Sequence, residues 1–286
     1  MTTGVARSLP SGILGVSSPP ICHTVDARWL MAYAASLGES AETFYDTLAP
    51  DGPSAHPLFP VCYEWPALVA LRERVIGDDL AALSVHATHD LVIERLPQAG
   101  DRVTTVARMV AVKPRRAGTL VVARLTTVDA AGRTLTITDY GSVYRGVETP
   151  ETGRIAEALS RRATPAGDVV WNARVELAAG AAHVYTECAR IWNPIHTDAA
   201  VARAAGLAAI ILHGTATLAL AVSRVVAREL GGDGARVRGV GARFTGFVRL
   251  PSAITVRGRG RDAITVAFDA VGADGNPVLD EGVVSA

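Results

Sequence analysis

Two segments in opposite halves of the chain share one order of elements, and this repeat limits the folds open to the chain. In the first half HDLVIERLPQAGDRVTTVARMVAV follows an apolar helical segment, and in the second half RFTGFVRLPSAITVRGRGR follows another. Their alignment places Arg95-Leu96-Pro97 on Arg249-Leu250-Pro251. A repeated helix-then-antiparallel-sheet unit indicates one supersecondary design used twice. The alternative is two unrelated α+β stretches that share a dipeptide.

Hydrophobic periodicity predicts the elements of each unit. Two helices are expected first, the earlier one with Asp26 as its N-cap, over 26–40 and 64–77. Alternation of apolar and polar residues then indicates strands over 86–96, 102–112 and 118–146. The last of these should turn back on itself at Asp129–Gly132. The second half should contain a strand over 169–177, helices over 198–209 and 213–230, and strands over 235–250, 253–261 and 263–284.

The composition changes between the two units. TPETGRIAEALSRRATPAG is polar and contains Pro150, Pro165 and two glycines, which is typical of a linker. We therefore divide the chain into an N-terminal domain, a linker and a C-terminal domain, over 1–149, 150–166 and 167–286. A chain of 286 residues can bury a large core without disulfides or metals. We expect the two sheets to join edge to edge, because this covers two exposed edges.

Composition argues against several classes of protein. Lysine plus arginine equals aspartate plus glutamate at 28 each, so no basic face for nucleic acid is indicated. Cys22, Cys62 and Cys188 form no CxxC pair and fit a reduced cytosol, and the N-terminus lacks the long apolar region of a signal peptide. The most apolar window, GLAAIILHGTATLALAVSRVVA, holds His213, Arg224 and three hydroxyl residues, so we interpret it as a buried helix and not a membrane span. A cytoplasmic location is expected.

The most informative short motif is RIWNPIHTD, from Arg190 to Asp198. Pro194 fixes its own φ angle and removes a backbone donor, so the loop presents the imidazole of His196 from a rigid frame. An imidazole of near-neutral pKa suits proton transfer, and a buried structural histidine is the alternative. Asn193 either orients His196 or a water, or caps the turn. Asp198 is most simply the N-cap of the next helix.

Four stretches together resemble the MaoC-like, or (R)-specific enoyl-CoA hydratase 2, family in its two-domain form. WNPIHTD resembles the hydratase signature around Asn-Pro-x-His, IILHGTATLALA the start of the long central helix, and ARFTGFVRLP the strand that follows this helix. HPLFPVCYEWPAL with HATHDLVIERLPQAGD resembles the degenerate N-terminal unit. The four stretches cover most of residues 20–285.

The resemblance implies an α+β fold, the double hotdog, in which two antiparallel sheets are each wrapped around a long helix. It implies that the C-terminal half supplies the catalytic loop, while the N-terminal half has lost its own motif and opens a tunnel for the acyl chain. The implied substrate is an acyl thioester on coenzyme A or an acyl carrier protein, and no metal or redox cofactor is implied. No membrane or nucleic-acid partner is expected, and both a homodimer and a heteromer are open.

The start of the predicted long helix offers a second part of a site. Helix N-termini present unpaired N–H groups and the positive end of the dipole. Gly214 would let a thioester carbonyl approach this backbone and find an oxyanion hole, which the resemblance places near that glycine. His213 is predicted to bind the substrate together with Gly214, and a structural role is the alternative. Ile191 and Trp192, in the loop before His196, are expected to contact the substrate.

Ile191 departs from the family's pattern. The family has its catalytic Asp five residues before the His, within Gly-Asp-x-Asn-Pro-x-His. Here Arg190 takes the Gly position and Ile191 takes the Asp position. Isoleucine cannot move a proton, so the water that the family holds between Asp and His loses one anchor. Loss of such a partner commonly lowers the rate by several powers of ten.

Other titratable residues are weaker candidates. Tyr185 and Glu187 precede the motif on a predicted strand, where period two would give them one face. His86 and His89 are spaced by three, so both cannot face the same side of a regular strand. One of them could reach the tunnel, and a solvated edge is the simpler interpretation for each.

Three hypotheses follow. The first is a hydratase or dehydratase of 3-hydroxyacyl thioesters, with His196 as its acid–base group and Asn193 beside it. The second keeps the thioester and His196 but changes the reaction to a Michael-type addition, an isomerisation or a hydrolysis. The third is a silent acyl-thioester binding subunit that works beside an active partner. Ile191 favours the last two, whereas the retained His196, Asn193 and Gly214 favour the first two.

Overall fold

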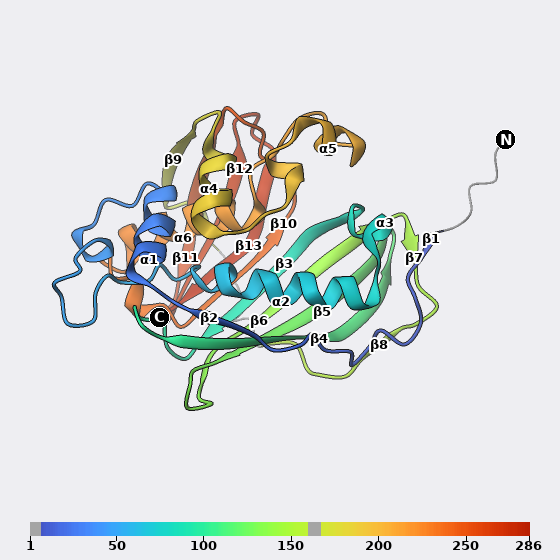
Figure 1. Ribbon diagram of the computed structural model, residues 1–286. Helices are drawn as coiled ribbons and strands as arrows, with labels where there is room; N and C mark the ends of the chain where they lie inside the picture. Colours follow the sequence, from blue (N-terminus) through green and yellow to red (C-terminus); the bar gives the residue numbers. More distant parts are fainter. Residues whose placement is uncertain (1–6, 160–166) are drawn as a thin grey trace.

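The N-terminal half packs one long helix against an antiparallel sheet (Figure 1). The structure is a computed structural model that describes residues 7–159 and 167–286. The long helix is α2 (Pro60–Val75), and its first residue is a proline, which suits the first helical turn. The other elements of this half are α1 (Ala27–Ser36), α3 (Asp78–Ala81), the 3-10 turn η1 (Glu42–Phe44), β1 (Arg7–Ser8), β2 (Ile21–Thr24), β3 (Ser84–Ile93), β4 (Arg102–Arg115), β5 (Gly118–Val128), β6 (Thr134–Arg145), β7 (Val147–Glu148) and β8 (Gly153–Arg154).

The C-terminal half repeats this plan around α6 (Gly214–Glu229). Leu218, Val222 and Val225 of this helix are fully buried, and apolar residues lie on most of its circumference. None of the helices in the described part of the chain is long and apolar enough to cross a membrane. The other elements are α4 (Ala181–Ala189), α5 (Ala199–Ala204), the 3-10 turns η2 (Pro194–His196) and η3 (Gly234–Arg236), β9 (Trp171–Leu177), β10 (Gly239–Phe244), β11 (Ser252–Arg261), β12 (Thr265–Gly272) and β13 (Pro277–Ser285).

The two halves share one continuous sheet, which confirms the expected edge-to-edge arrangement. Its strand order is β2-β4-β5-β6-β3-β10-β13-β12-β11-β9, with β8 beside β4. The junction is the antiparallel pair of β3 and β10, in which Leu91 lies opposite Val240. Both side chains are buried in a core cluster that also contains α1 and α6 residues. The pairing removes the exposed edge that each half would otherwise present.

Local signals in the sequence locate several element ends correctly. Asp26 caps α1 by accepting the backbone N–H of Trp29 at 2.7 Å, and Asp198 caps α5 by accepting that of Ala200 at 2.8 Å. Helix α5 is shorter than predicted, because Gly206 turns the chain with a left-handed φ of 80°.

One prediction needs correction. The segment with Tyr185 and Glu187 is helix α4 and not a strand, because AAHVYTECA supports helical spacing as well as period two. Residues two apart on a helix point in different directions, so Tyr185 is buried while Glu187 is exposed. Within the predicted linker, β8 pairs with β4 through Arg154 and Ala111. Residues 160–166 of that linker lie outside the described residues.

The shared sheet predicts that the two halves unfold together. Leu91 is 2% exposed at the junction, so Leu91→Ala should lower the free energy of unfolding by about 3 kcal/mol. Tryptophan fluorescence and far-UV circular dichroism should report one coincident denaturant transition for the wild type and the variant. Val170→Ala, at a side chain 68% exposed, is the control and should change little. Two separate transitions would show that the halves are independent.

Candidate active site

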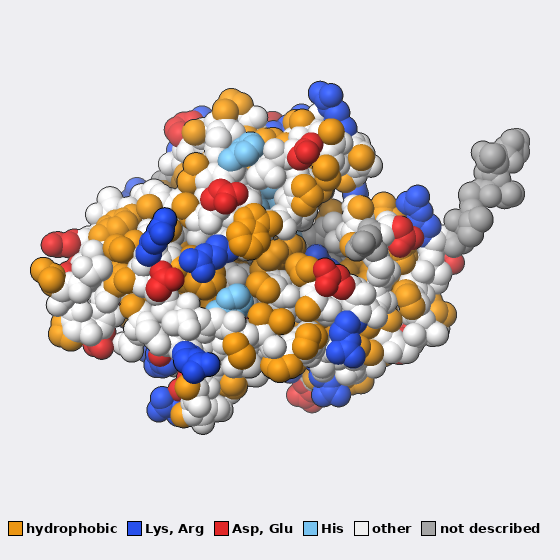
Figure 2. All heavy atoms as spheres, in the orientation of Figure 1, with side chains coloured by type: hydrophobic (Ala, Val, Ile, Leu, Met, Phe, Trp, Pro, Cys, Tyr) orange, Lys and Arg blue, Asp and Glu red, His pale blue; other side chains and the backbone are white. Residues whose placement is uncertain are grey.

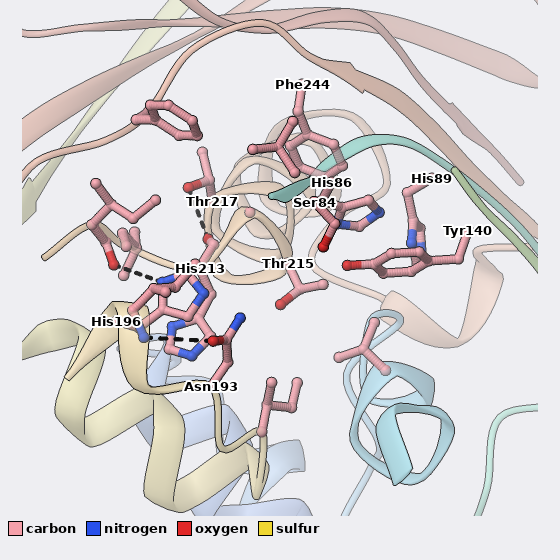
Figure 3. Close-up of a pocket in the computed structure, with 18 of the residues that line it drawn as sticks. Ser84, His86, His89, Tyr140, Asn193, His196, His213, Thr215, Thr217 and Phe244 are labelled. Carbon is pink, nitrogen blue, oxygen red and sulfur yellow. Dashed lines mark hydrogen bonds between the residues drawn. The ribbon is translucent and has the colours of Figure 1, made fainter. Parts of the chain in front are cut away.

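A cavity of about 310 Å³ opens where the two halves meet. One wall comes from α2, β3 and β6, and the other from residues 191–196, the start of α6 and residues 244–248. Figure 2 shows the surface hollowed between the region of α5 and the region of α3. Figure 3 shows the side chains inside. Because each half contributes one wall, the cavity exists only in the joined sheet.

His196 lines this cavity and is 8% exposed. Its Nδ1 lies 2.8 Å from the carbonyl oxygen of Ile211, and because a carbonyl can only accept, Nδ1 carries the proton. Nε2 therefore keeps its lone pair. Burial lowers the pKa of His196 to about 4, although the hydrogen bond to Ile211 acts in the opposite direction. The ring is thus a neutral base at pH 7.

Asn193 and His213 frame this ring (Figure 3). The side-chain oxygen of Asn193 accepts the N–H of Ile195 at 3.5 Å, so the predicted cap is present and the amide NH₂ can donate into the cavity. His213 stacks on His196 with ring centroids 3.7 Å apart and planes 24° apart. Its Nε2 lies 3.2 Å from the Thr186 hydroxyl. Burial, and then the neighbouring His196, keep the pKa of His213 well below its usual range.

Gly214 begins α6 at the edge of the cavity. A Cβ at this position would lie 3.1 Å from the ring of Phe244 and 3.6 Å from Nδ1 of His86, so a larger residue would crowd the approach. The first-turn N–H groups of a helix have no acceptor within it, and they carry the positive end of the dipole. This end of α6 therefore suits negative charge that develops on a carbonyl oxygen.

In the loop before His196, Ile191 faces the cavity and Trp192 faces the solvent. Ile191 is 4% exposed and lines the cavity as expected. Trp192 lies outside the cavity lining and is 61% exposed, and its contact with a substrate stays a prediction. Arg190 takes a left-handed φ of 58°, and its guanidinium lies 4.0 Å from the ring centroid of Trp29.

His86 and His89 both line the cavity, so neither lies at a solvated edge. Strand β3 is central, between β6 and β10, and its pairing with β6 shifts register between His86 and Thr88. This bulge adds one residue, which brings two side chains spaced by three to the same face. Burial lowers the pKa of both imidazoles. Among residues 7–159 and 167–286, no group of three or more His, Cys, Asp or Glu side chains is placed to hold a metal ion.

Tyr140 and Glu64 also line the cavity, and the sequence analysis did not predict either as a site residue. Tyr140 lies on β6, where period-two alternation marks it only as facing one side. Glu64 on α2 is 3% exposed and accepts a hydrogen bond from the Thr138 hydroxyl at 2.8 Å. Burial raises the pKa of Glu64 to about 7, and the threonine hydroxyls oppose this shift. The helical spacing of Val61, Glu64 and Leu68 could have placed this carboxyl on the inner face of α2.

We expect an NMR titration of ring nitrogens to show His196 with its proton on Nδ1 and a midpoint near pH 4. The unfolded chain takes up this proton near the usual pKa of about 6.5. The free energy of unfolding should therefore fall as pH drops from about 6.5 to about 4, by up to about 1.4 kcal/mol per pH unit from this residue. His196→Gln assigns the signal and should reduce that slope. A midpoint near 6.5 would contradict the buried neutral ring.

Comparison with known protein families assigns each half separately. Residues 164–279 match the family described as MaoC like domain, and residues 13–138 match the FAS1-like dehydratase domain region. Among curated proteins, fatty acid synthase subunit beta from Aspergillus oryzae is 38% identical over 99 residues. That match spans 32% of this chain and only 5% of that protein's length.

Solved structures share the whole architecture. A MaoC-like dehydratase from Phytophthora capsici has a TM-score of 0.82 at 24% identity, over 96% of both chains. The peroxisomal multifunctional enzyme type 2 from Drosophila melanogaster has a TM-score of 0.78 at 21% identity, over 94% of this chain and 48% of its own. A Mycobacterium tuberculosis protein described as having a double hotdog fold has a TM-score of 0.64 at 16% identity, over 95% of this chain and 96% of its own.

These likenesses confirm the predicted double hotdog. They establish the fold alone, because all are below 25% identity. The family matches agree with the resemblance of the motifs: residues 13–138 match a FAS1-like dehydratase region, and residues 164–279 match the MaoC like domain.

Proposed function

We propose that the protein is a hydratase or dehydratase that interconverts enoyl and 3-hydroxyacyl thioesters carried on coenzyme A or an acyl carrier protein. The observation that carries this proposal is the neutral His196, with its free Nε2, in a cavity that the N-terminus of α6 also lines. The dehydratase families matched by the two halves support a lyase reaction.

The geometry suits a dehydration in which one histidine moves one proton. With the thioester carbonyl oxygen at the start of α6, the first-turn N–H groups stabilise the negative charge that appears when C2 loses its proton. His196 Nε2 takes that proton, the C3–O bond breaks, and the C2=C3 bond forms. The imidazolium then gives the same proton to the leaving hydroxyl, which departs as water. Burial favours this return, because it makes the imidazolium a strong acid. Hydration is the reverse sequence.

Ile191 supports the competing functions. It fills the family's Asp position with an apolar side chain that is 4% exposed, so no carboxylate shares a water with His196 from that position. A related thioester reaction, such as a Michael-type addition, an isomerisation or a hydrolysis, would use His196 and the α6 N-terminus without needing that water. A binding subunit would need neither. Turnover assays on enoyl and 3-hydroxyacyl thioesters distinguish these cases.

His196→Ala should abolish measurable turnover of the native thioester, with a loss in kcat of at least about 10²- to 10⁴-fold, because it removes the proton carrier. The fold should persist, and circular dichroism with a thermal melt checks this. His183→Ala is the matched control, since that exposed histidine lies on α4 and bonds the Thr197 carbonyl outside the cavity. Wild-type turnover in a folded His196→Ala protein would rule out a catalytic role for this residue.

The wild type should be a poor hydratase of crotonyl-CoA, and Ile191→Asp should raise that activity by restoring a carboxylate beside the water site. The cost should be a lower melting temperature, because the new charge is buried and Arg190 is engaged by Trp29. Ile191→Asn is the control, since it has the same shape but cannot carry the proton. Equal rates in the two variants would show that the gain, if any, is not proton transfer. Ordinary wild-type rates would show that another group already fills the role.

A further inference from the structure

Tyr140 stands on the wall of the cavity that faces His196 (Figure 3). It lies on β6 of the N-terminal half, and its hydroxyl points across the cavity toward Thr215. Its ring stacks on His86, with centroids 3.7 Å apart and planes 13° apart. The guanidinium of Arg72 lies 5.7 Å from the ring centroid. The phenol is therefore held in one orientation by contacts that do not use its proton.

His86 connects this phenol to the start of α6. Its Nε2 donates to the Thr88 carbonyl at 3.1 Å, which fixes the imidazole within the bulge of β3. Its Nδ1 lies 3.6 Å from where a Cβ of Gly214 would stand. Tyr140 and Gly214 thus both neighbour the His86 ring, Tyr140 against its face and Gly214 near Nδ1. On the other side of Gly214, His213 stacks on His196. A thioester whose carbonyl meets Gly214 would have C2 and C3 between His196 and Tyr140.

The hydroxyl proton of Tyr140 is available to a ligand. Ser84 gives its proton to the Ala81 carbonyl at 2.9 Å, and Thr217 gives its proton to the His213 carbonyl at 3.1 Å. Arg72 donates to the Tyr140 oxygen, and none of the described residues accepts the proton of its hydroxyl. Burial raises the pKa of Tyr140 more than the nearby Arg72 lowers it, so the phenol stays protonated. It is a permanent donor that does not itself titrate near neutral pH.

We propose that Tyr140 binds the oxygen at C3 of the acyl group, as a hydrogen-bond donor, in place of the carboxylate that Ile191 does not supply. This inference rests on the proposed function. In the dehydration, His196 still carries the proton from C2 to the leaving hydroxyl. Tyr140 keeps its own proton and stabilises the oxygen as the C3–O bond breaks, so protons and electrons balance without another reactant. The N-terminal half thereby contributes a residue that touches the reacting atoms, while His86 positions it.

The test removes one oxygen atom. Tyr140→Phe keeps the stack on His86 and deletes only the hydroxyl. We expect kcat to fall about 10²-fold for hydration and for dehydration, as for loss of one preorganised donor. Tyr144→Phe is the matched control: Tyr144 lies on the same strand, is 1% exposed, also neighbours Arg72, and is outside the cavity lining. It should turn over at a rate close to the wild type. Equal rates in both variants would overturn the proposal.

Binding separates this role from a structural one. In a His196→Ala background, which does not turn over, the Kd of 3-hydroxybutyryl-CoA should rise about tenfold on Tyr140→Phe, because one hydrogen bond is lost. The Kd of butyryl-CoA, which has no oxygen at C3, should stay the same. Equal weakening of both ligands would show a packing role and overturn the proposal.

Turnover by the wild type and ligand binding by the Tyr140→Phe variant together distinguish the proposed hydratase function from the proposed role of Tyr140. A wild type that turns over no thioester, but whose Tyr140→Phe variant selectively loses 3-hydroxybutyryl-CoA, would overturn the hydratase function and support Tyr140 as the C3 oxygen's partner. A wild type that turns over enoyl thioesters, with Tyr140→Phe unchanged in rate and binding, would support the hydratase function and overturn the role of Tyr140. Failure of both ligands to bind would overturn both.

Discussion

The antiparallel pairing of β3 with β10 is the contact on which the rest of the structure depends. It joins two hotdog units into one sheet and buries Leu91 and Val240 on opposite strands. The same pair runs beside the cavity, because β10 ends at Phe244 and Thr88 pairs with the residue before it. If the two edges separated, each unit would present unpaired backbone groups and one bare wall of the site. Stability and site assembly are therefore consequences of a single contact.

Burial at this junction decides the electrostatics of the site. Desolvation is the first cause of the lowered pKa of His196, His213 and His86, and of the raised pKa of Glu64. Neutral imidazoles line the cavity beside the start of α6, so they do not oppose the positive potential of the helix dipole, which suits an enolate-like oxygen. A carboxylate at position 191 would partly cancel that potential. Ile191 is apolar and buried, so it leaves that potential unopposed from its position.

Structural features that depend on residues adjacent in the sequence, such as helix caps, could be predicted. Features that depend on how distant strands pair in the sheet could not. Asp198 caps α5 because a cap depends only on the next few residues, and the His213–Gly214 start of α6 follows from the apolar run after it. Glu187 was misplaced because its segment fits both periods, and only packing of α4 on the core chooses the helix. Tyr140 faces His86 through the register of β3 against β6, which connects residues some fifty positions apart. A single sequence carries no signal of that register.

The bulge in β3 orients a cavity side chain that a regular strand would turn away. A loop stiffened by a proline can aim one side chain, and the C-terminal unit uses this device for His196. A regular strand cannot turn residues three apart to one face, but the extra residue between His86 and Thr88 does so and places His86 against Gly214. The unit that resembles a degenerate copy therefore still shapes the site. Its strands fix the stack of His86 and Tyr140 beside the helix N-terminus of the other unit.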